Sequence, residues 1–237
     1  MAESVAVIHR VLSGGSTFPS VVETAVGRQY VLKLSGAGSG KRALATEFIA
    51  LRLAKHAGLN VPRAEIIDLP QDLPWQAGTD KFYETLQRST GPNLGVSFIA
   101  NAADVSPAEL QGLPQDFLAR IAAVDALLQN VDRRAAHANI MRDATGTLWA
   151  IDFGACLLIE RLARGATELR VELPPNHFLA GESNVSYRVA RIAAQVSAPL
   201  VTSIVAALPE GWLVDLGLSR HSLEQRLLAY IETARAS

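Results

Sequence analysis

The chain has 237 residues, of which 49% are hydrophobic and 19% are charged, and its formal net charge is −1. This composition is typical of a globular protein with a sizeable core and argues against a disordered or fibrous chain. The sequence has no long run of basic residues and no apolar stretch long enough for a membrane span, so direct nucleic-acid binding and membrane insertion are disfavoured.

Short β-favouring runs dominate the start of the chain. Residues 5–12, 21–26 and 29–34 are rich in β-branched and other apolar residues, and Ser13-Gly14-Gly15-Ser16 separates the first two runs. These runs predict a small antiparallel sheet whose first turn is rich in glycine.

Helical and extended segments then alternate. Residues 41–57 carry apolar side chains at helical spacing and end before Gly58, which predicts an amphipathic helix. Residues 62–69 predict another strand, residues 80–88 a weak helix, and residues 95–100 a further extended segment.

The second half is predicted to be mainly helical. Ser106-Pro107-Ala108-Glu109 has the residues of a capped helix start, and residues 116–129 form an amphipathic pattern. Residues 139–142 and 148–151 flank the turn-like Asp143-Ala144-Thr145-Gly146 and predict a small hairpin.

The remaining elements set the fold class. Residues 187–207, broken near Pro199, and residues 219–234 predict further helices. We therefore expect an α+β fold with two lobes. Residues 1–100 would form a small sheet with one helix, and residues 101–237 a mainly helical lobe that brings the hairpin to the cleft.

Two residues of the first half suggest a phosphate site. Lys33 lies in an alternating run on the face opposite Tyr30 and Leu32, where its ammonium could reach the phosphates of a nucleotide. Glu47 follows fourteen residues later within the predicted helix and could pair with Lys33. Exposure to solvent is an equal alternative, because charged residues on helices are mostly solvated.

Two aspartates of the second half complete the set. Asp132 begins a loop that ends at Asn139, where a carboxylate could orient an acceptor hydroxyl and an amide oxygen could hold a metal ion. Asp152 stands in a hydrophobic-Asp-Phe-Gly sequence after an apolar strand, where a carboxylate needs a cation such as Mg²⁺. In this order, the residues indicate phosphoryl transfer, which needs positioning and charge neutralisation.

The chain resembles the HipA-like kinases, relatives of the bacterial HipA toxin kinase and, more distantly, of protein kinases. The resemblance covers most of residues 8–156. The segments that carry it are Leu12-Ser13-Gly14-Gly15-Ser16, Tyr30-Val31-Leu32-Lys33, Arg42-Ala43-Leu44-Ala45-Thr46-Glu47, Gly58-Leu59-Asn60-Val61-Pro62, residues 125–133 and residues 148–155.

The resemblance implies a protein-kinase-like fold, the cofactors ATP and Mg²⁺, and transfer of the γ-phosphate to a hydroxyl, with a serine or threonine of a protein as the expected acceptor. The implied catalytic residues are Asp132 and Lys33, the nucleotide-binding residues Gly14, Gly15, Ser16, Lys33 and Glu47, and the metal ligands Asp152, Asn139 and His137. The relatives' toxin–antitoxin setting also suggests an antitoxin-like protein partner.

One position departs from the family pattern. Relatives usually carry asparagine five residues after the catalytic aspartate, and this chain has His137 there. Because Mg²⁺ prefers oxygen ligands, His137 suggests altered metal handling, with Asn139 as the substitute ligand. Related kinases also phosphorylate serines of their glycine-rich loop, so Ser13, Ser16 and Thr17 are candidates for the same modification.

Residues 35–42 nearly match a P-loop. Ser35 replaces the first glycine, however, and Arg42 replaces the serine or threonine whose hydroxyl binds Mg²⁺. The segment also follows strands joined by a tight turn instead of opening a βα unit. A P-loop enzyme is therefore disfavoured, although this loop could still lie near the nucleotide.

Two further functions stay open. A nucleotide-binding pseudokinase that regulates a partner would fit His137, and a small-molecule phosphotransferase would use the same fold. A serine hydrolase is disfavoured because the chain has no G-x-S-x-G sequence. The five histidines are scattered and form no metal motif, and a lone histidine is more often a surface or capping residue. Asp125, on an apolar helix face, either braces the Asp132 loop or faces solvent. Trp149 is expected to pack beside the strand before Asp152.

The expected compartment is the cytoplasm. The single cysteine, Cys156, cannot form an internal disulfide, as is common in reducing compartments. The first ten residues lack the basic and apolar regions of a secretory signal.

Overall fold

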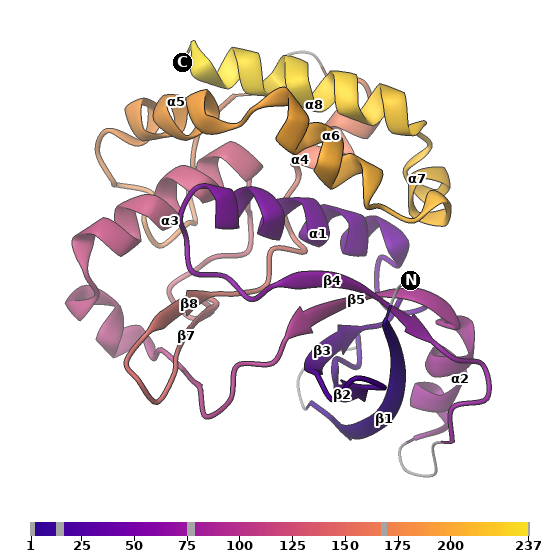
Figure 1. Ribbon diagram of the computed structural model, residues 1–237. Helices are drawn as coiled ribbons and strands as arrows, with labels where there is room; N and C mark the ends of the chain where they lie inside the picture. Colours follow the sequence, from indigo (N-terminus) through magenta and orange to yellow (C-terminus); the bar gives the residue numbers. More distant parts are fainter. Residues whose placement is uncertain (1–2, 13–16, 75–78, 167–169, 237) are drawn as a thin grey trace.

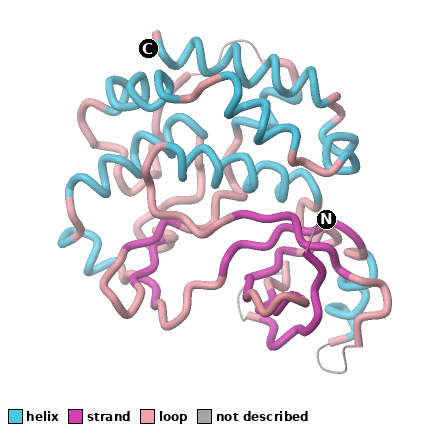
Figure 2. The backbone as a smooth tube through the Cα atoms, viewed as in Figure 1, coloured by secondary structure: helices cyan, strands magenta, loops and turns pink. Residues whose placement is uncertain are grey.

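The computed structural model describes residues 3–12, 17–74, 79–166 and 170–236. Within these ranges the chain is an α+β protein with most strands in its first half and most helices in its second (Figure 2). The predicted glycine-rich turn, with Gly14, Gly15 and Ser16, lies outside the described residues.

Five strands close a small barrel near the N-terminus (Figure 1). In order around the barrel they are β1 (Glu3–Val11), β2 (Ser20–Thr24), β3 (Gln29–Lys33), β5 (Gly91–Ser97) and β4 (Ala64–Leu69). Neighbouring strands are antiparallel except β1 and β4, which pair in parallel where Glu3 meets Ile67. The predicted antiparallel pairing of the first three runs is confirmed. The parallel pair of β1 and β4 that closes the barrel was not predicted, because this contact depends on the path of all the chain between the two strands.

The barrel encloses its own apolar cluster. Tyr30 and Leu32 of β3 are fully buried in it, which confirms the predicted alternation and leaves Lys33 on the other face. Gly95 of β5 allows close packing, since a Cβ there would lie 2.5 Å from Ile67 Cγ1 and 3.2 Å from Tyr30 Cδ1. Helix α2 (Asp80–Arg88) packs against the cluster through buried Phe82.

Strand β5 begins and ends earlier than the sequence predicts. The local Gly-Pro-Asn sequence suggests a turn. Asn93 is nevertheless buried, and its side chain forms hydrogen bonds with backbone groups that lack a backbone partner. Its Nδ2 donates to the carbonyls of Ser89 (2.7 Å) and Gly91 (2.8 Å), and its Oδ1 accepts from Ser35 N–H (2.7 Å).

Helix α1 (Lys41–His56) lies between β4 and β5 on one side and helices α4, α6 and α7 on the other (Figure 1). It starts at Gly40, whose φ of 63° favours glycine, and it is followed by Gly58 with φ 77°, as predicted. Because both faces are covered, most of α1 is buried, including Glu47.

The helical part contains α3 (Gln115–Leu128), α4 (Leu158–Ala163), α5 (Val185–Gln195), α6 (Ala198–Ala206), α7 (Glu210–Leu216) and α8 (Arg220–Arg235). The predicted break occurs at Val196 and Ser197, and α5 and α6 meet at 78°. In the described part of the chain, no single helix is long and apolar enough to cross a membrane, and this bent pair meets those criteria only when counted together.

The predicted hairpin is formed by β7 (Ile140–Arg142) and β8 (Leu148–Ala150), joined by β6 (Ala103–Asp104). The Asp143 carboxylate closes the turn by accepting the N–H groups of Thr145 and Thr147, and it also accepts Trp149 Nε1–H (2.9 Å). The hydrogen bond from the Thr145 hydroxyl, followed by that from Trp149, lowers the pKa of Asp143 to about 2. The capped start at Ser106 leads only into a short 3₁₀ helix, η1 (Pro107–Gly112), before α3 begins.

Candidate active site

Lys33, Glu47 and Asp152 meet although they come from a strand, a helix and a distant loop. Lys33 Nζ donates to Glu47 Oε1 (2.6 Å) and Oε2 (2.7 Å) and to Asp152 Oδ1 (2.9 Å). Glu47 is 2% exposed, so the solvent-facing alternative for this residue is wrong.

The cluster of Lys33, Glu47 and Asp152 carries more negative than positive charge. Burial alone would lower the pKa of Lys33, but the Glu47 and Asp152 carboxylates outweigh it and raise the pKa, so the ammonium stays charged. Burial raises the pKa of Glu47, whereas Lys33 opposes that rise. Burial would also raise the pKa of Asp152, but Lys33 holds it below its ordinary value. Two carboxylates against one ammonium leave one negative charge, which suits a cation.

The backbone around Asp152 is fixed in an unusual conformation. Asp152 has a φ of 55°, in the left-handed region that non-glycine residues seldom adopt. The N–H of Gly154 bonds to the Asp152 carboxylate, and the N–H of Phe153 bonds to Glu47. The segment is therefore held on both sides, and the half-exposed Asp152 side chain still has contact with solvent.

A buried ion pair fixes the loop that carries Asp132. Arg133 is fully buried and donates Nε–H to Asp125 Oδ2 (2.5 Å), while its NH1 donates to the carbonyls of Ala138 (2.7 Å) and Asn139 (2.8 Å). Asn130 Nδ2 donates to the other oxygen of Asp125 (3.0 Å). The predicted bracing role of Asp125 is thus confirmed, and its solvent-facing alternative is wrong.

His177 completes this network, which the sequence does not indicate. Its Nδ1 accepts the N–H of Leu179 (3.0 Å), so Nε2 carries the proton and donates to Asp125 Oδ2 (3.0 Å). The His177 side chain is fully buried, and the expectation of a surface or capping position is wrong for this histidine.

Backbone pairing joins the Asp132 loop to the Asp152 segment. Asn130 forms a β-bridge with Cys156, and Leu157 N–H donates to the carbonyl of Gln129 (3.1 Å). Ile151 N–H donates to the carbonyl of Asn139 (2.9 Å), which places Asn139 beside the residue that precedes Asp152.

A cavity of about 790 Å³ lies next to these segments. Its lining includes Thr46, Val131 and Gly154, which lie one or two residues from Glu47, Asp132 and Asp152 in the sequence. Residues 35–40 form much of another wall, and a Cβ on Gly38 would lie 2.9 Å from Thr17 Cγ2. The near-P-loop segment therefore lies beside both the cavity and the residue that follows the glycine-rich turn.

The predicted site residues fall into three groups. Lys33, Glu47 and Asp152 are in direct contact, and Asp132 and Asn139 belong to the loop joined to the Asp152 segment. His137 is exposed on the same loop, where its backbone pairs with Arg134. Gly14, Gly15 and Ser16 lie outside the described residues.

The donors available to a metal ion are oxygens. Among the described residues, no cluster of three or more histidine, cysteine, aspartate and glutamate side chains is arranged to hold a metal. Asp152 with the nearby Asn139 fits Mg²⁺, because this ion commonly takes one or two protein oxygens and completes its shell from phosphate and water.

Comparison with known proteins identifies a family and a similar solved structure. The model of the HipA-like kinase family matches residues 5–227. The structure is similar to the crystal structure of a Helicobacter pylori proinflammatory kinase, CtkA, with a TM-score of 0.61 and 14% sequence identity. The alignment covers 98% of this chain and 97% of that one, and at this identity it shows a shared fold alone. No curated protein matches the sequence.

Proposed function

The chain belongs to the HipA-like kinase family, and we propose that it transfers the γ-phosphate of ATP, with Mg²⁺, to a serine or threonine hydroxyl of a protein. The observation that carries this proposal is the contact of Lys33 Nζ with both Glu47 and Asp152. Phosphoryl transfer needs a fixed cation at the phosphates and a carboxylate for the metal, and this cluster offers both.

Each residue of the cluster has a distinct role in the proposal. Glu47 holds the Lys33 ammonium, which contacts the nucleotide phosphates, and Asp152 and Asn139 hold the metal. Mg²⁺, when bound, would neutralise charge on those phosphates. Asp132 orients the acceptor hydroxyl and accepts its proton, and the Arg133–Asp125 ion pair keeps the Asp132 loop in position.

The proposal includes the predicted lobes. Residues 1–100, with the barrel, and residues 101–237, with the helices, would enclose the nucleotide, and Gly14, Gly15 and Ser16 belong to the residues proposed to bind it. A protein acceptor, an antitoxin-like partner and a cytoplasmic location belong to the same proposal.

A nucleotide-binding module without phosphotransfer is the second candidate. The observation that favours it is His137, because its exposed imidazole replaces an amide oxygen expected for the second metal. Tight ATP binding without Mg²⁺-dependent turnover would support this function over the kinase.

The lysine that binds ATP distinguishes the kinase from a P-loop protein. Removing Lys33 alone would leave buried Glu47 without its partner, so we compare the double variant Lys33→Met/Glu47→Gln with Lys41→Met. The double variant is expected to lose ATP affinity by about tenfold or more, and Lys41→Met to retain it, in a calorimetric titration with Mg-ATP.

Thermal melting of both variants gives the folding control. Loss of ATP binding in a folded Lys41→Met variant, with binding retained in the double variant, would reject the proposed site and assign the nucleotide to residues 35–42.

A further inference from the structure

We propose that a cationic groove between α1, the start of β4 and β8 binds an acidic segment of a partner protein. The groove, of about 390 Å³, is lined by Leu51, Arg52, Lys55, Val61, Pro62, Arg63, Ala64, Ser97 and Trp149. It shares none of the residues proposed for phosphoryl transfer, so this binding does not depend on the catalytic proposal.

Positive charge exceeds negative charge at the groove. Arg52, Lys55 and Arg63 line it, and the carboxylate of Glu65 lies 3.4 Å from both Arg52 NH2 and Arg63 Nε. One carboxylate is therefore shared by two guanidinium groups, and Lys55 forms no ion pair with any described residue. Three cations against one anion leave two positive charges uncompensated. Arg52 and Lys55 also repel each other, because they are three residues apart on one helix.

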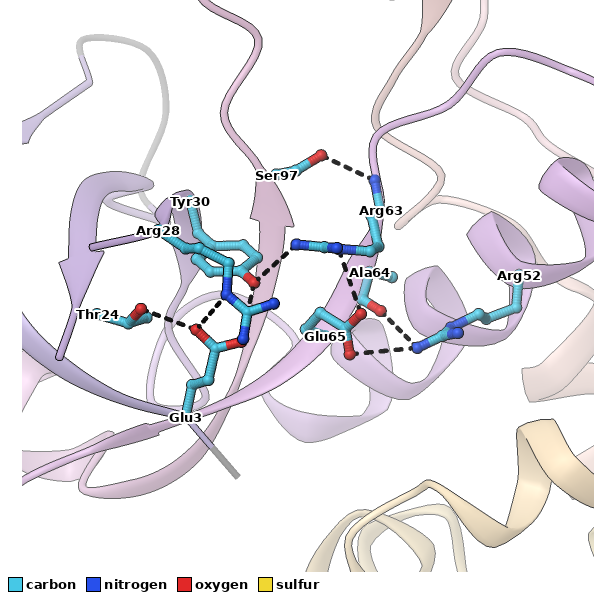
Figure 3. A network of polar contacts seen from close by, with 9 residues as sticks. All are labelled: Glu3, Thr24, Arg28, Tyr30, Arg52, Arg63, Ala64, Glu65 and Ser97. Carbon is cyan, nitrogen blue, oxygen red and sulfur yellow. Dashed lines mark hydrogen bonds and ion pairs between the residues drawn. The ribbon is translucent and has the colours of Figure 1, made fainter. Parts of the chain in front are cut away.

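The two arginines are held in place rather than free (Figure 3). Arg52 NH2 donates to the carbonyl of Ala64 (2.8 Å), and its guanidinium lies 5.1 Å from the centre of the Phe48 ring. Arg63 NH2 donates to Tyr30 Oη (3.2 Å), and its backbone N–H donates to Ser97 Oγ (2.9 Å). Fixed side chains lose little conformational freedom when a ligand binds.

Hydrogen bonding at Arg52 is incomplete as well. Its Nε is buried and has no acceptor within the part of the chain that the structure describes. This buried Nε–H is out of a ligand's reach, but 39% of the Arg52 side chain is exposed, and its guanidinium can form charge-assisted hydrogen bonds with a carboxylate there.

The walls favour a peptide over a nucleic acid. Leu51, Val61 and Pro62 supply apolar surface, and Trp149 is fixed by its Nε1–H bond to Asp143. A short segment with acidic residues around one apolar or aromatic side chain matches both the charge and these walls. A nucleic-acid strand would need a longer basic surface than this small groove in a chain of net charge −1 provides.

Lys55→Glu tests the groove with a matched control. Lys55 is exposed, so reversing its charge leaves the core intact, and Lys81→Glu makes the same change on the exposed face of α2. The probe is a short fluorescein-labelled peptide of aspartate, glutamate and phenylalanine, followed by fluorescence anisotropy. We expect the wild type and Lys81→Glu to bind it with affinity that falls as salt rises, and Lys55→Glu to bind on the order of tenfold more weakly.

The remaining measurements can overturn the proposal. No binding of the acidic peptide at low salt, equal binding by the two variants, or equal binding of a peptide with glutamine and asparagine in place of the acids would each reject it. Tighter binding of a single-stranded oligonucleotide that Lys55→Glu abolishes would assign the groove to nucleic acid instead. A dimer of the wild type that Lys55→Glu dissociates, seen by analytical ultracentrifugation, would assign it to a second copy of the chain.

Discussion

Asp152→Asn is expected to lower ATP-dependent phosphorylation by at least about a hundredfold, the scale seen when one preorganised charged or polar partner of the reacting groups is removed. The asparagine keeps the shape of the side chain but loses the charge that contacts Lys33 Nζ at 2.9 Å and that suits Mg²⁺. Because Lys33 lowers the pKa of Asp152, the wild-type carboxylate is ionised at neutral pH, and the substitution removes a full negative charge.

The control for this prediction makes the same chemical change on an exposed carboxylate. Asp116 of α3 is 79% exposed and forms an ion pair with Arg120 one helical turn away. Transfer of labelled phosphate from ATP to mixed protein acceptors, or to the chain itself, should be lost in Asp152→Asn and retained in Asp116→Asn. Equal activity of the two variants would remove Asp152 from the reaction.

Asp125→Asn is expected to lower the free energy of unfolding by about 3–5 kcal/mol, because it leaves the buried Arg133 guanidinium without its charge partner. Asp125 is fully buried and also accepts hydrogen bonds from Asn130 and His177, so the amide cannot satisfy all three donors. This change exceeds that of Asp116→Asn, since exposed ion pairs contribute only about 0–1 kcal/mol.

Urea denaturation at neutral pH measures this difference, and its pH dependence gives a second check. Burial alone would raise the pKa of Asp125, but Arg133 and the hydrogen bond from His177 outweigh it, so the pKa is lowered in the folded protein. The stabilisation is therefore present above the unfolded pKa of about 3.9 and is lost as the pH falls through the lower folded value. A difference below about 1 kcal/mol at neutral pH would mean that the Asp125–Arg133 pair is exposed or open in solution.

The sequence correctly predicts the local elements on which the site residues lie. Alternation in β3 correctly separates Lys33 from the barrel core, because strand side chains point to opposite faces. Helical spacing and Gly58 correctly place Glu47 inside α1. The predicted pairing of Glu47 with Lys33 is present in the structure, whereas the direct contact of Lys33 with Asp152 was not predicted.

Non-local contacts are what the sequence does not reveal. The parallel pairing of β1 with β4 and the burial of His177 against Asp125 join segments far apart in the chain. No periodic pattern marks such contacts. Likewise, Asn93 sits in a sequence typical of a turn, and only its buried side-chain hydrogen bonds explain why β5 starts before it.

The near-P-loop segment shows how a local motif depends on its surroundings. Arg42 replaces the hydroxyl residue that such loops need, and its Nε donates to the carbonyl of Asp215 (2.6 Å). From the sequence, this loop could still lie near the nucleotide. In the structure it lines the cavity beside Val131 and Gly154. Its position, and not its resemblance to a P-loop, relates it to the candidate site.

A crystal structure with Mg²⁺ and a non-hydrolysable ATP analogue tests the central claim most directly. The account predicts the phosphates in contact with Lys33 Nζ and a metal ion on the Asp152 carboxylate, with Asp132 facing the terminal phosphate. Phosphates bound at residues 35–42, or a nucleotide that touches neither Lys33 nor Asp152, would contradict it.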